Sequence, residues 1–257
     1  MNWSVRRKLF YLVLVVLFAV AVSSYFLIPL FKENPTCFDG KQNGEELGVD
    51  CGGACTNLCL SQVRPLSILW QRSFQVTTGI YDTLGYVENQ NSNAGIPVLL
   101  YRFKLYDEKN ILVAERDGKT FMGPNQSWAI FESGIKTGER IPKRAFLEFA
   151  DIQWVKIDPS FEKVSFSVTN KNLSSTSTTP RLSTTISNDS LIDLKNVEVV
   201  AIIHGEDDNA IASSKTTIDS LPKRSSKDAF FTWLSPIHEN VGRIEVIPRV
   251  NPFSGQY

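Results

Sequence analysis

The chain has 257 residues, with 27 lysine and arginine residues against 27 aspartate and glutamate residues, so its formal net charge at pH 7 is zero. Nucleic-acid-binding proteins usually carry a basic excess, and this balance argues against that class of partner. An apolar content of 42% and a charged content of 21% are typical of a folded protein and not of a disordered one. The length allows one or two domains.

An uncharged apolar stretch near the N-terminus predicts a membrane-spanning helix over residues 9–31. Of these 23 residues 20 are apolar, and the cations Arg6, Arg7 and Lys8 precede them with no acid nearby. A helix of this length measures about 35 Å, enough to cross a hydrocarbon core of about 30 Å. The positive-inside rule places residues 1–8 in the cytoplasm, so we expect a single-pass protein of the plasma membrane whose later domains lie outside.

A cleaved signal peptide is the alternative interpretation of the same segment. Ala19-Val20-Ala21 resembles a small-residue cleavage site. The apolar region of a signal peptide usually runs for about 7–15 residues, however, and this one continues well past Ala21. The sequence therefore favours a retained anchor.

Four cysteines follow within the segment 32–62, which we expect to form a small collar outside the membrane. An oxidising compartment makes two disulfides the default, but four cysteines allow three pairings and the sequence does not choose among them. The segment has few large apolar residues, so cross-links must supply its order. It resembles a Cys-rich motif of bacterial surface and secreted proteins, with the pattern Cys-x-Asp-Gly-x-x-Asn-Gly-x-Glu-x-Gly-x-Asp-Cys-Gly-Gly-x-Cys. The cysteines are Cys37, Cys51, Cys55 and Cys59.

Two metals are conceivable in this collar. Zinc on four thiolates is disfavoured, because the cysteine spacing differs from the paired Cys-x₂-Cys arrangement of structural zinc sites. Calcium is the other, since Asp39, Asn43, Glu46 and Asp50 offer hard oxygen ligands in a glycine-rich loop. Their spacing is not that of an EF-hand, and the simpler interpretation is turn residues with solvated acids. We predict no other cofactor.

From about Leu66 the apolar pattern has a period of two, which predicts β-strands. Leu99, Tyr101, Phe103 and Leu105 alternate with Leu100, Arg102 and Lys104, which predicts a half-buried strand. Short strands with turn signals about every ten residues indicate an all-β sandwich or barrel. We expect turns at 107–110, at Gly118-Lys119-Thr120 and at 123–125, and strands at 111–114 and 128–131.

A second run repeats this order about 99 residues later. Ile186-Ser187-Asn188 corresponds to Val87-Glu88-Asn89, and Phe230 corresponds to Phe131. The apolar positions of 197–203 match those of 99–105 at an offset of 98. The sequence therefore predicts two tandem β-sandwiches over 63–158 and 159–257, although two unrelated sandwiches would share some of this patterning.

Phe103-Lys104-Leu105-Tyr106-Asp107 spells the signature of the FxLYD domain, and the first sandwich resembles that family over about 90 residues. The resemblance implies an immunoglobulin-like β-sandwich of bacterial and archaeal envelope proteins, with no established catalytic residues to transfer. In physical terms, Phe and Leu fill the core, Tyr packs at the sheet rim and Asp opens a turn. The second sandwich has Ala201–Gly205 at this position and resembles the family in pattern only.

We place the join between the sandwiches near Ile157-Asp158-Pro159-Ser160. The stretch 174–185 contains nine Ser and Thr residues among twelve. It predicts either a flexible loop or an edge strand split by Pro180, since proline cannot donate to a ladder.

The sequence contains no set of residues at a spacing typical of a catalytic site. His204 and His238 have no partner by spacing, and the known hydrolase, zinc-protease and dinucleotide motifs are missing from the sequence. The tryptophans outside the membrane segment are expected in the cores, although exposed tryptophans would suit a contact surface. These are Trp70, Trp128, Trp154 and Trp233.

The sequence thus predicts a non-catalytic, membrane-anchored module for protein–protein contact or structural support in the cell envelope. The envelope partner is not identified by any residue pattern. An accessory or catalytic component of a glycan-acting enzyme complex is the alternative. That alternative requires two carboxylates facing each other in a pocket, about 5–9 Å apart.

Overall fold

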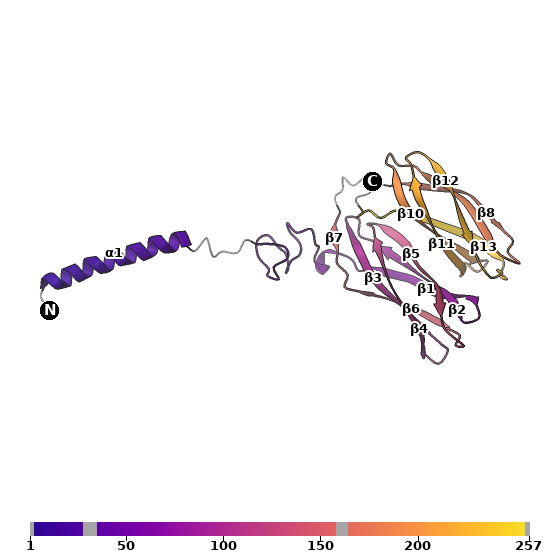
Figure 1. Cartoon of the computed structure of the whole chain (residues 1–257), viewed down its shortest axis with the longest axis horizontal. Helices are drawn as coiled ribbons and strands as arrows, with labels where there is room; N and C mark the ends of the chain where they lie inside the picture. Colours follow the sequence, from indigo (N-terminus) through magenta and orange to yellow (C-terminus); the bar gives the residue numbers. More distant parts are fainter. Residues whose placement is uncertain (1–2, 28–34, 158–163, 255–257) are drawn as a thin grey trace. The chain divides into compact units, whose positions relative to one another are not determined.

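The structure is a computed structural model, which describes residues 3–27, 35–157 and 164–254. The chain divides into two compact units, Met1–Cys55 and Thr56–Tyr257. The second unit contains both β-sandwiches together with the last part of the Cys-rich segment. Figure 1 shows the elements in chain order.

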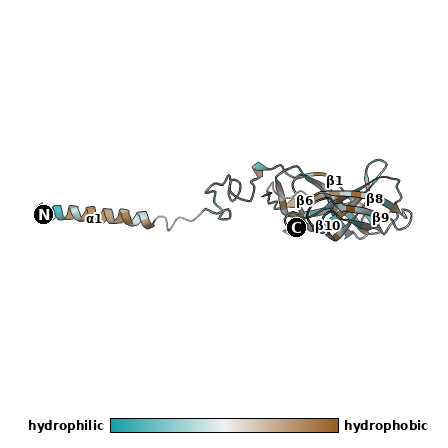
Figure 2. Ribbon diagram, turned by 90° about the horizontal axis from the view of Figure 1, so that it is seen from above, coloured by the Kyte–Doolittle hydropathy of each residue, from teal (hydrophilic) through white to brown (hydrophobic). Residues whose placement is uncertain are grey.

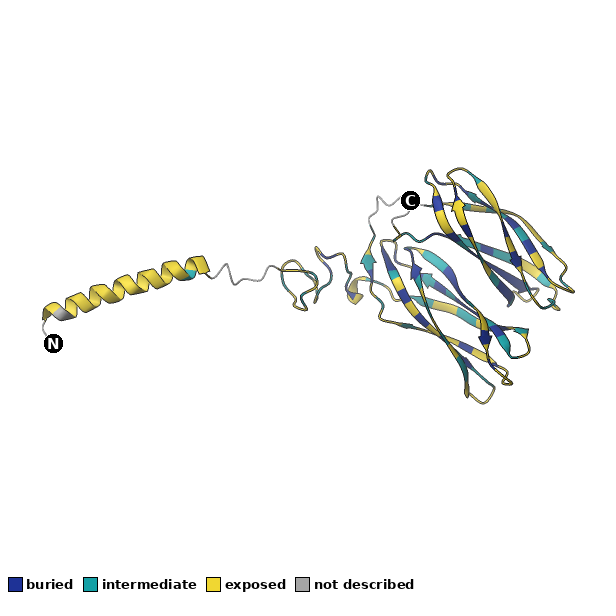
Figure 3. Ribbon diagram, in the orientation of Figure 1, coloured by how far each residue is buried: buried dark blue, intermediate teal, exposed yellow. Residues whose placement is uncertain are grey.

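The N-terminal helix α1 spans Trp3–Leu27. It begins before the predicted start at residue 9, while residues 28–31 lie outside the described part of the chain. Its stretch Arg6–Leu27 is, among the described residues, the one helix long and apolar enough to cross a membrane. The helix is exposed along most of its length and predominantly apolar, as Figures 2 and 3 show. A helix that buries none of this surface in its own protein needs an apolar environment elsewhere.

The first sandwich consists of two sheets. One has the strand order β1-β2-β5 and the other β4-β3-β6, with β7 pairing with the start of β3 beyond the end of β6. A short 3₁₀ helix, Leu60–Gln62, precedes them. The strands are β1 (Ser67–Thr77), β2 (Ile80–Asn89), β3 (Ala94–Tyr106), β4 (Leu112–Met122), β5 (Gln126–Lys136), β6 (Arg144–Ala150) and β7 (Val155–Lys156).

The second sandwich repeats this topology. Its sheets have the orders β12-β9-β8 and β11-β10-β13, so each of its six strands takes the place of the strand seven earlier. Within the described residues the fold is therefore all-β apart from α1 and the short 3₁₀ helix, which confirms the predicted class. The strands are β8 (Phe166–Ser174), β9 (Arg181–Asn188), β10 (Leu194–Gly205), β11 (Ala210–Leu221), β12 (Ser226–Thr232) and β13 (Val241–Arg249).

The FxLYD-like residues lie where scaffold chemistry requires them. Phe103 and Leu105 of β3 are fully buried in the first sandwich. Tyr106 is half-buried, and its ring packs edge-on against Phe146 of β6. The carboxylate of Asp107 accepts hydrogen bonds from two backbone N–H groups of the β3–β4 turn, those of Lys109 and Ile111. These four residues stabilise the hairpin and its packing.

The expected hairpin turn at Gly118-Lys119-Thr120 is wrong, because these residues lie inside strand β4. Gly118 pairs with Tyr101 of β3, and the Tyr101 ring lies over the glycine. A Cβ atom at Gly118 would come within 2.3 Å of that ring. The glycine therefore marks a close aromatic packing contact on a strand and not a turn.

Two buried asparagines occupy the corresponding ends of β2 and β9. Asn89 donates from Nδ2 to the carbonyl oxygens of Ala94 and Gly123, at 2.8 and 2.7 Å. Asn188 donates from Nδ2 to three carbonyl oxygens, those of Ile192, Leu221 and Pro222. The Oδ1 atom of each asparagine accepts the backbone N–H two residues later. The repeat in the sequence thus corresponds to the same asparagine hydrogen-bonding arrangement in both sandwiches.

The Ser/Thr-rich stretch 174–185 is neither a single loop nor an edge strand. Pro180 is buried at the entrance to β9, which is the central strand of its sheet. Because Pro180 precedes the strand, its missing N–H removes no ladder hydrogen bond there. The predicted join near residue 158 falls partly on 158–163, outside the described residues.

The two sandwiches share one hydrophobic cluster. Val200 and Ile202 of β10 are fully buried and pack into the core cluster of the first sandwich, whereas Val199 and Ala201 pack into that of the second. Strand β10 is therefore covered on both faces. This packing joins the outer face of sheet β1-β2-β5 to the outer face of sheet β11-β10-β13.

Candidate functional site

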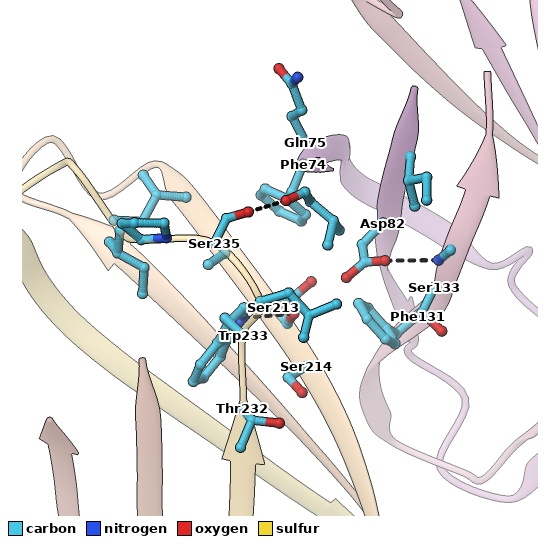
Figure 4. Close-up of a pocket in the computed structure, with 18 of the residues that line it drawn as sticks. Phe74, Gln75, Asp82, Phe131, Ser133, Ser213, Ser214, Thr232, Trp233 and Ser235 are labelled. Atoms are coloured by element: carbon cyan, nitrogen blue, oxygen red, sulfur yellow. Dashed lines mark hydrogen bonds between the residues drawn. The ribbon is translucent and has the colours of Figure 1, made fainter. Parts of the chain in front are cut away.

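A pocket of about 670 Å³ lies between the two sandwiches. Strands β1, β2 and β5 of the first sandwich form one side, and β11 with the loop that follows β12 forms the other. Figure 4 shows these side chains around the pocket. Its volume is within the range of small-molecule sites, about 300–1,000 Å³.

Aromatic rings form much of the pocket wall. Phe74 and Phe131 come from the first sandwich and are 9% and 8% exposed. Trp233 comes from the second, and its indole N–H donates to the carbonyl oxygen of Ser213 at 3.0 Å. The hydroxyl of Ser235 donates to the carbonyl oxygen of Val76, which closes one side of the pocket. Because these groups are held by packing and hydrogen bonds, the pocket is preformed.

Two polar groups of the pocket are incompletely satisfied. Asp82 is half-buried, and one of its carboxylate oxygens accepts the N–H of Gly134 at 2.9 Å. Burial raises the pKa of Asp82, and the Gly134 hydrogen bond offsets this only in part. The hydroxyl of Ser213, a residue 2% exposed, has no hydrogen-bond partner among the described residues. A buried hydroxyl without a partner costs free energy, so such groups call for an explanation.

A second, smaller cavity of about 420 Å³ is lined by charged side chains that pair with one another. Glu245 accepts hydrogen bonds from the hydroxyl of Tyr86 at 2.9 Å and from Arg243 at 3.0 Å, and lies 3.3 Å from Nε2 of His204. Burial and the neighbouring carboxylate raise the pKa of Tyr86. Arg243 also binds Asp208 at 2.9 Å. Both carboxylates of this cavity therefore share one guanidinium, and the hydrogen bond from Tyr86 to Glu245 connects this cluster to the first sandwich.

Arg249 of β13 is the most deeply buried charge that we find in the described residues. It is 3% exposed, and its guanidinium forms an ion pair with Glu198 at 2.7 Å. It also donates to the carbonyl oxygen of Phe121 and to the hydroxyl of Thr120 in the first sandwich. Burial lowers the pKa of Arg249 to about 10, and Glu198 offsets that in part. The side chain is thus still charged at neutral pH and connects the two sandwiches.

The calcium candidates bind backbone groups and one another. Both oxygens of Asp50 accept the N–H of Gly40, and one also accepts that of Asp39. Asp39 accepts the side-chain amide of Asn43, which, with backbone hydrogen bonds, lowers the pKa of Asp39. Glu46 accepts the N–H groups of Asn43 and Asp50, both at 3.3 Å. The four residues therefore hydrogen-bond within the collar itself.

The cysteines of the collar are oxidised. Cys37 and Cys55 form a disulfide, and Cys51 and Cys59 are also disulfide-bonded. The structure thus selects one of the three pairings that the sequence left open for Cys37. The Sγ atoms of Cys37 and Cys55 lie close to the carboxylate of Glu46, but thiols committed to a disulfide are not available as thiolate ligands.

The sequence did not indicate the pocket, although two of the residues that line it, Trp233 and His238, were named for other reasons. His238, which it named, lies exposed at the pocket, and His204 belongs to the smaller cavity. Trp128 and Trp154 are buried, as expected, whereas Trp70 and Trp233 lie at the boundary between sandwiches. One signal was available: positions 199–203 are all apolar, and a strand that is apolar on both faces is typically covered on both.

No protein-family model matches the chain, and no curated protein matches it. Among solved structures, a red sea bream transglutaminase is similar over 74% of this chain, with 10% sequence identity and a TM-score of 0.25. A β-glucuronidase of Parabacteroides merdae is similar over 85%, with 10% identity and a TM-score of 0.20. The chain covers 30% and 34% of those two proteins, about a third of each. Likenesses at this level carry no argument about activity.

The apolar N-terminal helix and the disulfides define the coarse class of the protein. They fit an extracytoplasmic module with a membrane anchor or a signal sequence at its N-terminus. The β-sandwiches form the bulk of that module.

Proposed function

We propose that the chain is a non-catalytic module of the cell envelope, anchored by α1 and projecting its two sandwiches outside the plasma membrane for protein–protein contact or structural support. Its first sandwich would belong to the FxLYD type of immunoglobulin-like domain, and its second would be a divergent domain of similar pattern. The burial of Phe103 and Leu105 and the turn made by Asp107 support that assignment.

The observation that carries the proposal is the way the sandwiches are joined. Charged and polar side chains of the second sandwich bind the first through Arg249, Glu245 and Ser235, and Arg72 of the first binds the carbonyl oxygen of Ala210. Together with the shared hydrophobic cluster, these contacts favour a rigid body over two flexibly linked domains. A rigid double sandwich suits a scaffold that presents a surface at a fixed geometry.

The corresponding faces of the two sandwiches differ in a way that suits this role. The outer face of β1-β2-β5 carries Phe131 and is covered by the second sandwich. At the equivalent position of β12, Phe230 is 65% exposed, and its neighbours across the sheet are Ser183 and other hydroxyl residues. The outer face of β12-β9-β8 is thus polar with one exposed aromatic ring, a composition found at protein contact surfaces.

Site-specific photo-cross-linking in the native envelope tests the contact. A benzoylphenylalanine at Phe230 and another at Phe146, on an outer face of the first sandwich, sample two separate surfaces of the full-length chain. We expect a discrete adduct with an envelope protein from at least one position. A benzoylphenylalanine in the exposed Glu108 turn is the matched control. Equal background at all three positions would contradict the contact proposal.

A further inference from the structure

The pocket between the sandwiches contains a carboxylate with one unoccupied oxygen. The first oxygen of Asp82 accepts the Gly134 N–H, and the second oxygen points toward the second sandwich in Figure 4. Among the described residues, no lysine, arginine or histidine forms an ion pair with Asp82. A half-buried carboxylate without a nearby cation carries an uncompensated negative charge, and its burial costs free energy.

The groups opposite Asp82 complete the chemistry of the pocket. Ser213 brings a buried hydroxyl without a described partner, and Phe131 and Trp233 bring apolar walls from the two sandwiches. The titratable groups that also border the pocket are Lys215, His238 and Glu239, and all three are exposed. The charge inside the pocket is therefore the one of Asp82, so the pocket complements a single cation attached to an apolar body.

We propose that this pocket binds an organic cation, an alkylammonium or guanidinium group on an apolar stem. The cation lies on the free oxygen of Asp82 and within reach of the Ser213 hydroxyl, and the stem lies against Phe131 and Trp233. Charge-assisted hydrogen bonds of this kind are among the stronger polar contacts in proteins. An aromatic ring beside a cation adds a further attraction. The cation comes either from a small free amine or guanidine or from a basic side chain of a polypeptide.

Calorimetric titration of the full-length chain in detergent micelles tests the proposal. The probes are n-butylguanidinium and its neutral isostere n-butylurea. A second pair consists of the peptide acetyl-Leu-Arg-Leu-amide and the same peptide with citrulline in place of arginine. We expect the cationic member of at least one pair to bind at least tenfold more tightly than the neutral member. Quenching of tryptophan fluorescence gives an independent readout, since Trp233 lines the pocket.

Matched variants separate the pocket from the overall charge of the protein. Asp82→Asn keeps the oxygen that accepts the Gly134 N–H and removes the charge, and we expect it to weaken binding of the cationic probe at least tenfold. Asp219→Asn removes one exposed charge from the same β11 strand that borders the pocket and should change binding less than twofold. Ser213→Ala should weaken binding severalfold without loss of folding, because the hydroxyl has no partner to lose.

Each outcome either supports or contradicts the proposal, and a supporting outcome also identifies the source of the cation. Binding of butylguanidinium indicates a small free organic cation, and binding of the arginine peptide alone indicates a basic side chain of a polypeptide. Equal binding of cationic and neutral probes, equal effects of the two Asp variants, or no binding by either pair would overturn the proposal. None of these outcomes bears on the topology or on cross-linking at Phe230, so the proposed envelope function stands or falls separately.

Discussion

The guanidinium carbon of Arg249 lies 3.7 Å from the centroid of the Trp128 ring, so a cation of the second sandwich lies on an aromatic ring of the first. The ring of Phe121 lies 3.9 Å away from the same carbon. Glu198 neutralises the charge from within the second sandwich. Removing one partner of a buried pair leaves an uncompensated charge, which costs more than the pair itself contributes.

Arg249→Ala should therefore destabilise the protein by about 3 kcal/mol or more. The matched control is Arg243→Ala on the same strand, because Arg243 also pairs with acids but has a side chain 48% exposed. We expect that control to cost less than about 1 kcal/mol. Chemical denaturation of the full-length chain measures both. Equal losses for the two variants would show that Arg249 does not join the sandwiches.

The two buried asparagines should be equally important for their own sandwiches. Asn89→Ala and Asn188→Ala each remove a buried side-chain amide that donates to at least two carbonyl oxygens, and we expect a loss of about 2 kcal/mol or more for each. Asn172→Ala, at an exposed strand position, should change stability by less than about 0.5 kcal/mol. Thermal unfolding followed by circular dichroism makes the comparison. A loss confined to one of the two sites would contradict their equivalence.

Gly118→Ala should cost about 1–3 kcal/mol, although alanine is normally better than glycine in a strand. The cause is the Tyr101 ring, which occupies the space of the added methyl group. Tyr101→Phe keeps the ring, so Gly118→Ala should remain costly in that background. In a Tyr101→Ala background the same change should cost much less. A double-mutant cycle measures the coupling, and additive effects would rule out the ring contact as the cause.

Asp82 should make stability depend on pH in an unusual direction. Burial raises its pKa in the folded state above 3.8, so the folded state holds its proton more strongly than the unfolded state does. The contribution of Asp82 to stability therefore declines as pH rises from 3.8 through the folded pKa. Asp82→Asn should stabilise the protein at pH 7, by no more than about 1 kcal/mol. This gain should vanish below pH 3.8, and a gain independent of pH would exclude titration of Asp82 as its source.

The collar should not require calcium. The oxygens of Asp50 already accept the N–H groups of Asp39 and Gly40, and Glu46 likewise accepts two backbone N–H groups. Titration of calcium into the EDTA-treated full-length chain should give only the heat of dilution. A saturable calcium-dependent heat that Asp50→Asn abolishes would restore these residues as ligands.

Much of the fold was predictable from the sequence because burial in a half-exposed strand leaves a simple pattern. Leu99, Tyr101, Phe103 and Leu105 are all buried, as their alternation predicts. Gly118 misled the prediction, since glycine marks both turns and close ring contacts, and the ring that decides lies on another strand. The sequence placed the start of the apolar segment at residue 9, but α1 starts at Trp3. A helix can extend beyond its apolar stretch into the charged residues that precede it.

The pocket could not be predicted, because its groups are far apart in the chain. Asp82 and Ser213 face the same space only after two sheets of different sandwiches pack together. Asp82 alone looks like any polar residue on one face of a strand, here the central strand β2. The apolar pair Val200 and Ile202 did carry the relevant signal, since it marks a second covered face on β10. The sequence could thus indicate that the sandwiches pack together, but not which side chains meet there.

Protease accessibility tests the central claim, which is that α1 anchors a module lying outside the plasma membrane. The measurement uses right-side-out membrane vesicles that contain the full-length chain with a C-terminal epitope. The account predicts that added protease removes the epitope from the membrane-bound chain without permeabilisation. An epitope that stays protected until the membrane is opened would place the sandwiches inside the cell and contradict the account.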